Sequence, residues 1–383
     1  MSSAGRRATP AATAPAAVPL LDLGRGWPEI RELALARLDE LARSGELTLG
    51  SELEEFEREW AAFCGSEHCV GVADGTCALQ LALLAVGAGP GTEVITAANT
   101  FIATVEAIAL TGARPVLVDA NPSTRCLDAD AVAAAIGPQT RAVVAVHLYG
   151  YPAPVAEIMR ACEGRGVAVI EDAAQAHGAR LGDRQVGALG TAAAFSFYPT
   201  KNLGAFGDAG AVVSDNPELI DYVRSLRHHG CALDDANLHL HAGMTGRLDN
   251  LQAALLRLKL PGLRQAHEAR RAAAARYRAA LSDLPLRLPP EDPVDGEQAY
   301  HLFVIEAEHR DDLLAALREH KIGAAIHYPR PAHLEPAWRE LGHGPGTLPV
   351  AEELCDHVLS LPFFPQITEA EQDRVVEVLR QAL

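Results

Sequence analysis

Short apolar runs alternate with longer, helix-like segments between residues 69 and 214. The runs cover residues 69–73, 93–97, 115–119, 142–147, 167–172, 192–197 and 209–214. The early runs are nearly continuous in apolar residues, as is typical of parallel strands that are buried on both faces. The segments 76–87, 101–111, 128–136 and 153–165 are long enough for crossover helices. The pattern predicts a doubly wound α/β fold with a large, mostly parallel sheet, whose ligands bind at the carboxyl ends of the strands.

Helical segments flank this region on both sides. Before it, the apolar spacing predicts helices over 31–42 and 51–64, the second with Ser51 as its N-cap. After Leu248, two consecutive helices are predicted, with an interruption at Pro261.

The last third of the chain predicts a smaller α+β unit. A proline-rich joint over 284–296 precedes a strand at 301–307, a helix at 310–320 and a strand around 323–328. We therefore expect a disordered leader over 1–18, a large domain over 19–260, and a small C-terminal domain with its connecting helix over 261–383.

Composition excludes several classes of function. The 33 basic and 50 acidic residues give a net charge of −17 without a basic stripe, which disfavours nucleic-acid binding. The longest apolar stretches, such as 79–88, fall short of the roughly 20 residues that span a bilayer. The seven cysteines are scattered and have no zinc-like spacing. We expect reduced thiols in a cytoplasmic protein that has no metal site and no membrane contact.

Lys201 is the most informative candidate for chemistry. It follows an apolar run in the segment FSFYPTKNLGAFGDAG, residues 195–210. A lysine in a loop is usually a solvated surface charge. Here the aromatic side chains at 195, 197, 198 and 206 are expected to desolvate the amine and lower its pKa, the condition for attack on an aldehyde.

A carboxylate pair ends the run at 167–172. Asp172, at the predicted carboxyl end of a strand, could pair with a protonated ring nitrogen. Taken alone, Glu171 and Asp172 fit a helix cap better. Gln175 could reach a phenolic oxygen on the same ring, although the polar face of a helix is the simpler interpretation.

Three further segments are candidates for binding a phosphate group or stacking on an aromatic ring. Gly75 and Thr76 lie between the first run and a helix, where free amides and the helix dipole attract phosphate. Ser196 is a second candidate donor, and Phe101 could lie flat on a ring. Each has a simpler structural role as a turn breaker, cap or core residue. Together they match the needs of pyridoxal 5′-phosphate.

These residues carry a family resemblance. The segments EDAAQAHGA and FSFYPTKNLGAFGDAGAVV closely resemble the DegT/DnrJ/EryC1/StrS family of pyridoxal-phosphate-dependent sugar aminotransferases. The resemblance runs from about residue 20 to the C-terminus and takes in VHLYG (146–150), RLDNLQAALLRLKL (247–260) and IHYPRPAHL (326–334). It implies fold type I architecture. Some relatives have His in place of the lysine and perform dehydration, so Lys201 favours transamination.

The resemblance also implies roles for the candidates. Lys201 bonds to the cofactor aldehyde, Asp172 meets the pyridine nitrogen, and Gln175 approaches the ring hydroxyl. Phe101 stacks on the ring, and the phosphate is held by Gly75, Thr76 and Ser196.

A homodimer with shared active sites is implied as well. The 243–250 loop is expected to reach the partner's site, with Arg247 on a substrate anion and Thr245 where many relatives have Asn at the phosphate. His327 and Tyr328 are expected to line the substrate cleft. Asp74 departs from the usual neutral residue before Gly-Thr, and a carboxylate there would repel phosphate unless it points away.

The implied function is transfer of an amino group from glutamate or glutamine to a ketone of a nucleotide-linked, dTDP-type deoxysugar, as in antibiotic biosynthesis. Arg25 and Arg330 are candidate contacts for the diphosphate. One alternative is a keto-cyclitol acceptor of the scyllo-inosose type, and another is a non-catalytic, cofactor-binding regulatory protein. A Rossmann dehydrogenase is disfavoured because no GxGxxG follows the first run.

Overall fold

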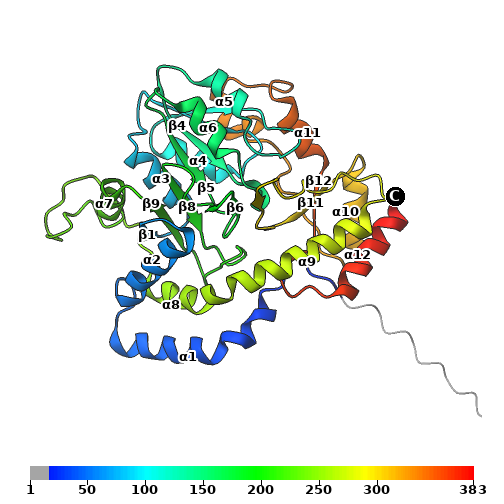
Figure 1. Cartoon of the computed structure of the whole chain (residues 1–383), viewed down its shortest axis with the longest axis horizontal. Helices are drawn as coiled ribbons and strands as arrows, with labels where there is room; N and C mark the ends of the chain where they lie inside the picture. The colour runs from blue at the N-terminus through cyan, green and yellow to red at the C-terminus, as the bar shows by residue number, and fades with distance from the viewer. Residues whose placement is uncertain (1–16) are drawn as a thin grey trace, which may run out of the picture.

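A seven-stranded sheet forms the centre of the larger part of the protein in the computed structural model, which describes residues 17–383 (Figure 1). Its strand order is β1-β9-β8-β5-β4-β2-β3. The strands are β1 His68–Val72, β2 Glu93–Ala97, β3 Arg114–Val118, β4 Thr140–Val146, β5 Ala168–Asp172, β8 Ala192–Ser196 and β9 Gly210–Ser214. Only β9 is antiparallel to its neighbours, β1 and β8. The predicted mostly parallel sheet is confirmed.

Helices cover the sheet at the predicted crossovers. They are α3 Gly75–Ala85, α4 Ile102–Leu110, α5 Ala129–Ala135 and α6 Val155–Cys162. A further helix, α7 Pro217–Leu226, follows β9 and was not predicted. Successive side chains of β8 and β9 point to opposite faces of the sheet and belong to two different cores. Ala194 and Val212 pack in the core that contains α3 and α4. Phe195 and Val213 pack in the other core, with Trp60. Ser196 therefore continues the face of Ala194, at the end of β8.

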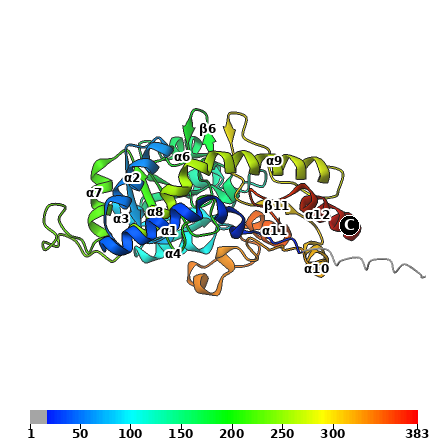
Figure 2. The same ribbon diagram turned by 90° about the horizontal axis from the view of Figure 1, so that it is seen from below.

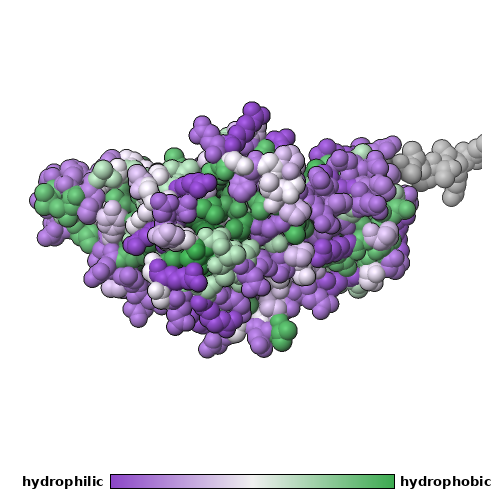
Figure 3. Space-filling view, turned by 90° about the horizontal axis from the view of Figure 1, so that it is seen from above, coloured by the Kyte–Doolittle hydropathy of each residue, from purple (hydrophilic) through white to green (hydrophobic). Residues whose placement is uncertain are grey.

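An exposed arm projects from this part of the molecule after α7 (Figures 1 and 2). It carries Leu233, Leu238 and Leu240, each at least half exposed at 56%, 50% and 57%. Apolar surface is visible at that end of the molecule in Figure 3. Such side chains are unusual on a free loop tip and typical of a contact surface.

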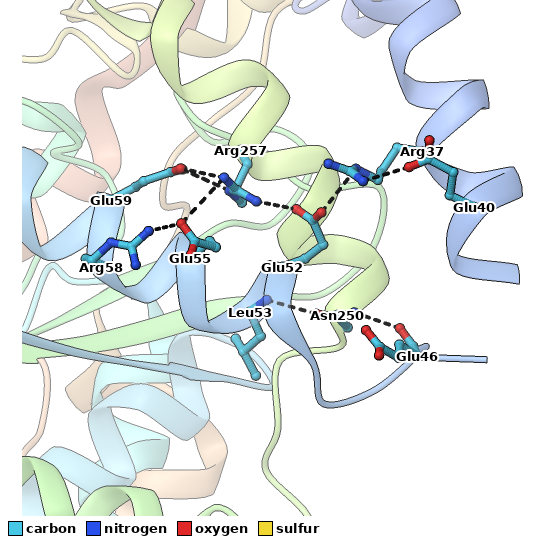
Figure 4. A network of polar contacts seen from close by, with 10 residues as sticks. All are labelled: Arg37, Glu40, Glu46, Glu52, Leu53, Glu55, Arg58, Glu59, Asn250 and Arg257. Atoms are coloured by element: carbon cyan, nitrogen blue, oxygen red, sulfur yellow. Dashed lines mark hydrogen bonds and ion pairs between the residues drawn. The ribbon is translucent and has the colours of Figure 1, made fainter. Parts of the chain in front are cut away.

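Three helices at the N-terminal side are joined by ion pairs (Figure 4). They are α1 Trp27–Ser44, α2 Ser51–Cys64 and α8 Asn250–Lys259. The carboxylate of Glu52 is nearly buried between Arg37 at 3.1 Å and Arg257 at 2.7 Å. The predicted cap at Ser51 is wrong, because Ser51 is the first helical residue and the cap position is Gly50, which has no side chain to make a capping bond.

A smaller α+β unit follows the long helix α9 Leu263–Leu281 (Figure 1). It contains β11 Phe303–Glu306, α10 Arg310–Glu319, α11 Pro349–His357, β12 Val358–Leu361 and α12 Glu369–Ala382. The predicted strand around 323–328 is wrong. β12 pairs with β11 instead, and the 323–328 segment makes only an isolated bridge from Ala325 to Ser360. The N-terminal segment crosses Gly323, where a Cβ would lie 2.4 Å from the Leu20 nitrogen.

Short elements complete the fold. A three-stranded sheet joins β6 Arg180–Leu181, β7 Arg184–Gln185 and β10 Gly296–Glu297 (Figure 2). Short 3₁₀ helices occur at Leu23–Gly26, Leu148–Gly150, Leu260–Gly262, Ala332–Leu334 and Pro336–Leu341. No helix within residues 17–383 has both the length and the apolarity to cross a membrane.

The predicted disordered leader over 1–18 overlaps the described part of the chain only at residues 17 and 18. Residues 1–16 lie outside the described part of the chain, whereas Val18 is 2% exposed and packs in the core of the smaller unit. The division into domains at residue 260 stays a prediction. Across it, the buried Arg125 pairs with Glu306 at 2.7 Å and donates to the Val304 carbonyl at 2.7 Å.

Candidate active site

A cavity of about 650 Å³ lies beyond the carboxyl ends of β1, β4, β5 and β8. Its lining brings together nine residues that the sequence singles out from distant segments. They are Gly75, Thr76, Phe101, Asp172, Gln175, Ser196, Lys201, His327 and Tyr328. The position agrees with the general rule for ligands of parallel α/β sheets.

Lys201 lies in a tight loop between β8 and β9. Its amide donates to the Tyr198 carbonyl at 2.8 Å, and the Ala205 amide donates to the Phe197 carbonyl at 2.7 Å. Gly204 is required for this path, since a Cβ there would lie 2.3 Å from the Pro199 oxygen. Burial lowers the pKa of the Lys201 amine to about 8, although the charge of Asp172 opposes the shift.

The source of this desolvation differs from the prediction. Phe195 and Phe197 face away from the cavity and pack edge-on against Trp60, because they occupy the opposite side of the pleat from Ser196. Of the four predicted aromatic residues, only Tyr198 lines the cavity. The amine is desolvated by the fold of its own loop and by the cavity walls.

Asp172 ends β5 and is 6% exposed. Its Oδ2 accepts a hydrogen bond from the Thr104 hydroxyl at 2.7 Å, and Oδ1 accepts from the Ala174 amide at 3.2 Å. Burial nevertheless raises the pKa of the carboxyl group, because two neutral donors do not replace water around a charge. A cationic partner would satisfy it. Thr104 was not predicted as a site residue, because its only signal in the sequence is its place in the first turn of the helix that follows Phe101.

Glu171 has a different environment. It is fully buried and accepts from the amides of Gly187, Leu189 and Gly190 at 2.9, 2.8 and 2.8 Å and from His147 at 3.0 Å. It therefore fixes the 187–190 loop to the end of β5. Neither carboxylate caps a helix, so that alternative interpretation is wrong.

The N-terminus of α3 forms one end of the cavity. Gly75 is in close contact with Ser196, since a Cβ on Gly75 would lie 2.6 Å from the Ser196 Cβ. The Asp74 carboxylate accepts from the Cys77 amide at 2.8 Å and so caps its own helix. This contact leaves the amides of Gly75 and Thr76 and two hydroxyl groups as donors for an anion.

Gln175, Tyr328 and Phe101 form another part of the lining. The Gln175 amide donates to the Tyr328 hydroxyl at 3.1 Å, and its Oε1 accepts from the Tyr149 amide at 2.6 Å. The Phe101 ring lies 5.2 Å from that of Tyr328 and is 46% exposed, so an open apolar surface remains for a planar ligand.

Two histidines complete the lining. Burial and the nearby Lys201 charge lower the pKa values of both His301 and His327, which are therefore neutral near pH 7. His327 bonds to the Ser360 hydroxyl at 2.8 Å and His301 to Asn202 at 3.2 Å. The sequence argument missed His301, which has no distinguishing motif.

The other predicted residues lie outside the cavity. Thr245 is exposed and bonds to His229 at 3.2 Å, and Arg247 bonds to His228 at 3.3 Å. Arg25 is paired with Asp22 and Glu371, and Arg330 with Glu335 at 3.1 Å. The cavity formed by the described residues is therefore lined by no arginine.

The residues present fit pyridoxal phosphate. The charge of Lys201 does not offset the desolvation of Asp172. The desolvated Lys201 amine and the buried Asp172 carboxylate line the same cavity as the α3 amides and the exposed Phe101 ring. Each matches one part of the cofactor: the aldehyde, the pyridine nitrogen, the phosphate and the ring face. Within residues 17–383, no cluster of three or more His, Cys, Asp or Glu side chains could hold a metal ion.

Comparison with known proteins agrees with this site. The sequence model of the DegT/DnrJ/EryC1/StrS aminotransferase family matches residues 28–380. The dTDP-3-amino-3,4,6-trideoxy-alpha-D-glucose transaminase of Streptomyces venezuelae is 44% identical over 95% of this chain and 96% of its own length.

Solved structures extend the match to the fold. The crystal structure of S. venezuelae DesV superposes with a TM-score of 0.92 at 43% identity, over 95% of this chain and 98% of DesV. NtdA of Bacillus subtilis, with bound cofactor PMP, gives a TM-score of 0.90 at 33% identity, over 96% of this chain and 85% of NtdA. The chain therefore belongs to the DegT/DnrJ/EryC1/StrS aminotransferase family and is a pyridoxal-phosphate-dependent transaminase of fold type I.

Proposed function

We propose that this enzyme transfers an amino group from glutamate or glutamine to the C3 ketone of a deoxysugar linked to dTDP. The observation that carries the proposal is the convergence of Lys201 and Asp172 on one cavity that also gathers neutral hydrogen-bonding side chains, among them Gln175, His301 and Tyr328. The name of the 44% identical relative supports the dTDP group and the C3 position. A cytoplasmic location remains a prediction from the sequence.

The cofactor would be held by the residues that the cavity gathers. The amides of Gly75 and Thr76 and the Ser196 hydroxyl would bind the phosphate, while Phe101 would cover the ring. Pyridoxal phosphate supplies an aldehyde and a ring that accepts the electron pair of a broken C–H bond. Gln175 has one amide hydrogen beyond its bond to Tyr328 and would donate it to the ring hydroxyl.

Lys201 would first bind the aldehyde and then serve as the proton carrier. Once released by the amino donor, the amine would take the proton from the α-carbon of the donor and deliver it to the former aldehyde carbon. A pKa of about 8 suits this task, because the amine gains and loses a proton near physiological pH. In the second half-reaction, Lys201 would return a proton to the sugar carbon.

Asp172 would hold a proton on the ring nitrogen. Its burial favours a strong pairing with a cation, and Thr104 orients its Oδ2 from the side. Thr104 is thus a positioning residue that acts through Asp172.

Neutral hydrogen-bonding groups around Lys201 would contact the sugar. His301, His327 and Tyr198 line the cavity, and the two imidazoles are uncharged. Uncharged donors and acceptors of this kind suit hydroxyl groups. They do not by themselves discriminate a deoxysugar from a cyclitol.

A second copy of the chain would complete the site. The donor carboxylate and the nucleotide diphosphate need cations, and the cavity formed by the described residues has no arginine. Thr245 and Arg247 follow the projecting arm and would enter the partner's cavity. The exposed leucines of the arm support a homodimer, since they would be covered by a partner.

Two half-reactions test the proposal. Glutamate or glutamine should convert the cofactor of the purified enzyme to its amine form, and a dTDP-linked 3-keto-deoxysugar should restore the aldehyde form, as followed by absorbance. Faster restoration by a keto-inositol would favour the cyclitol acceptor. If no amino donor produced the amine form, the regulatory alternative would replace the proposal.

A further inference from the structure

A second cavity of about 740 Å³ lies on the other side of the loop that carries Lys201. The segment 199–206 lines it, together with the start of α1, the end of α8 and the start of α9. Leu21, Thr200 and Lys201 line both cavities, so the loop is the partition between them. Apart from Lys201, no residue to which a cofactor role is given above lines this second cavity.

Lys259 is a partly buried cation at this cavity. Its amine donates to the Gly204 carbonyl and lies 5.1 Å from the centre of the Phe206 ring. No carboxylate within residues 17–383 forms an ion pair with it. Burial lowers the pKa of the amine to about 8. A lysine placed in this way has hydrogens free for an acceptor that the protein does not supply.

Arg270 is a second buried cation in the lining. It is 3% exposed, and its Nη1 donates to the carbonyls of Tyr300 and His301 at 3.1 and 3.3 Å. Its Nε is buried without any hydrogen-bond partner among the described residues. Burial lowers its pKa to about 10, and no carboxylate offsets that shift. A buried donor nitrogen without an acceptor costs free energy, which a bound acceptor would recover.

The remaining walls are largely apolar. Trp27 and Phe206 lie with their ring centres 5.5 Å apart, and Phe364 is also in the lining. Two carboxylates line the cavity, but neither neutralises the cations: Asp22 is paired with Arg25 at 3.1 Å, and Glu29 is exposed. The volume falls within the range of small-molecule sites, roughly 300 to 1,000 Å³.

We propose that this cavity is a second binding site, distinct from the catalytic one, for a small anion that carries a flat ring, namely a nucleoside diphosphate. Lys259 and Arg270 bind the phosphates, and the aromatic walls contact the base. The bound anion lies against the loop that carries Lys201, so its occupancy is sensed at the catalytic amine. This proposal does not depend on which ketone the enzyme aminates.

The chain has only three lysines, Lys201, Lys259 and Lys321, which makes a direct test available. Equilibrium dialysis of the holoenzyme with dTDP should give two molecules bound per chain. Lys259→Gln keeps a donor for the Gly204 carbonyl but removes the charge. It should weaken one of the two sites by about tenfold or more and leave the other unchanged. The exposed Lys321→Gln is the matched control and should retain both.

A footprint on the unmodified protein supplies the second measurement. Acetylation by acetic anhydride, quantified by peptide mass spectrometry, should slow at Lys259 when dTDP is added and stay constant at Lys321. A single dTDP per chain in the wild type, or unchanged acetylation at Lys259 under saturating dTDP, would overturn the proposal. Neither measurement requires turnover, so failure here and failure of the aminotransferase assignment are distinguishable.

Discussion

Two adjacent carboxylates at the end of β5 are expected to respond in opposite ways to loss of charge. Glu171→Gln should destabilise the apoenzyme without changing any group in the cavity. Asp172→Asn should leave the free energy of unfolding nearly unchanged and impair the chemistry. The contrast follows from what each side chain contacts, because both residues are almost completely buried.

The magnitude for Glu171 follows from its hydrogen bonds. One oxygen accepts from Leu189 and Gly190, and the other accepts from Gly187 and His147. The His147 Nδ1 accepts from the Ala153 amide, so the neutral ring donates through Nε2. Glutamine replaces one oxygen with a donor and leaves two donors without an acceptor. At about 1.5 to 3 kcal/mol for each charge-assisted bond, the loss is about 3 to 6 kcal/mol.

The Asp172→Asn substitution should change the free energy of unfolding less. Asparagine keeps one oxygen for Thr104, and the Ala174 amide, which loses its acceptor, lines the cavity, where water can replace that acceptor. Burial also raises the pKa of the carboxyl group, so the ionised form is disfavoured in the apoenzyme. We expect a change within about 1 kcal/mol. Formation of the amine form with glutamate should fall at least about a hundredfold, since the proton on the ring nitrogen loses its counter-ion.

Urea unfolding of both apoenzymes at pH 7 measures these differences. Glu67→Gln is the control, because that side chain is 74% exposed and its loss should cost less than about 0.5 kcal/mol. A loss below about 1 kcal/mol for Glu171→Gln, or equal destabilisation by both variants, would refute the assignment of a structural role to Glu171 and a chemical role to Asp172.

Three further predictions concern the same cavity. Gly75→Ala should raise the Kd for pyridoxal phosphate by about tenfold or more, because the added Cβ would lie 2.6 Å from Ser196. Gly137→Ala is the control and should leave the Kd unchanged, because its Cβ meets no atom within 4 Å. Equal Kd values for the two variants would contradict the phosphate site. The rate at which the apoenzyme binds the cofactor should rise as pH rises through about 8, because the Lys201 amine becomes neutral there. An inflection of that rate near the ordinary lysine pKa of 10.5 would show that the amine is solvated. Thr245→Ala should change the free energy of unfolding by less than about 0.5 kcal/mol, since Thr245 is exposed, yet weaken cofactor binding in the dimer; unchanged binding would argue against a shared site.

Local pattern was sufficient to predict the strands of the main sheet. All seven apolar runs are strands, with ends within a few residues of those predicted, because buried strands need continuous apolar side chains. The direction of β9 was not predictable from its composition. β9 returns from the Lys201 loop beside β8, and this tight connection makes it antiparallel.

The C-terminal unit was harder to predict. The segment 323–328 has strand-like composition, but it borders the cavity through His327 and Tyr328 and lies against the N-terminal segment. Long-range packing decides whether such a segment forms a strand, and the periodicity of its side chains does not predict that packing.

The site itself was largely predictable by one rule, that functional residues follow the carboxyl ends of strands. The rule located Lys201 and Asp172 but not the residues that support them. Thr104 and His301 reach the cavity through tertiary packing, and the separate role of Glu171 depends on a loop 16 to 19 residues later in the chain.

The most direct test of the account is to locate the covalent attachment of the cofactor. Reduction of the holoenzyme with borohydride fixes an imine as a stable amine, and peptide mass spectrometry then identifies the modified lysine among the three in the chain. The account predicts pyridoxyl label on Lys201 alone and none in Lys201→Ala. Label on Lys259 or Lys321, or undiminished label in Lys201→Ala, would contradict it.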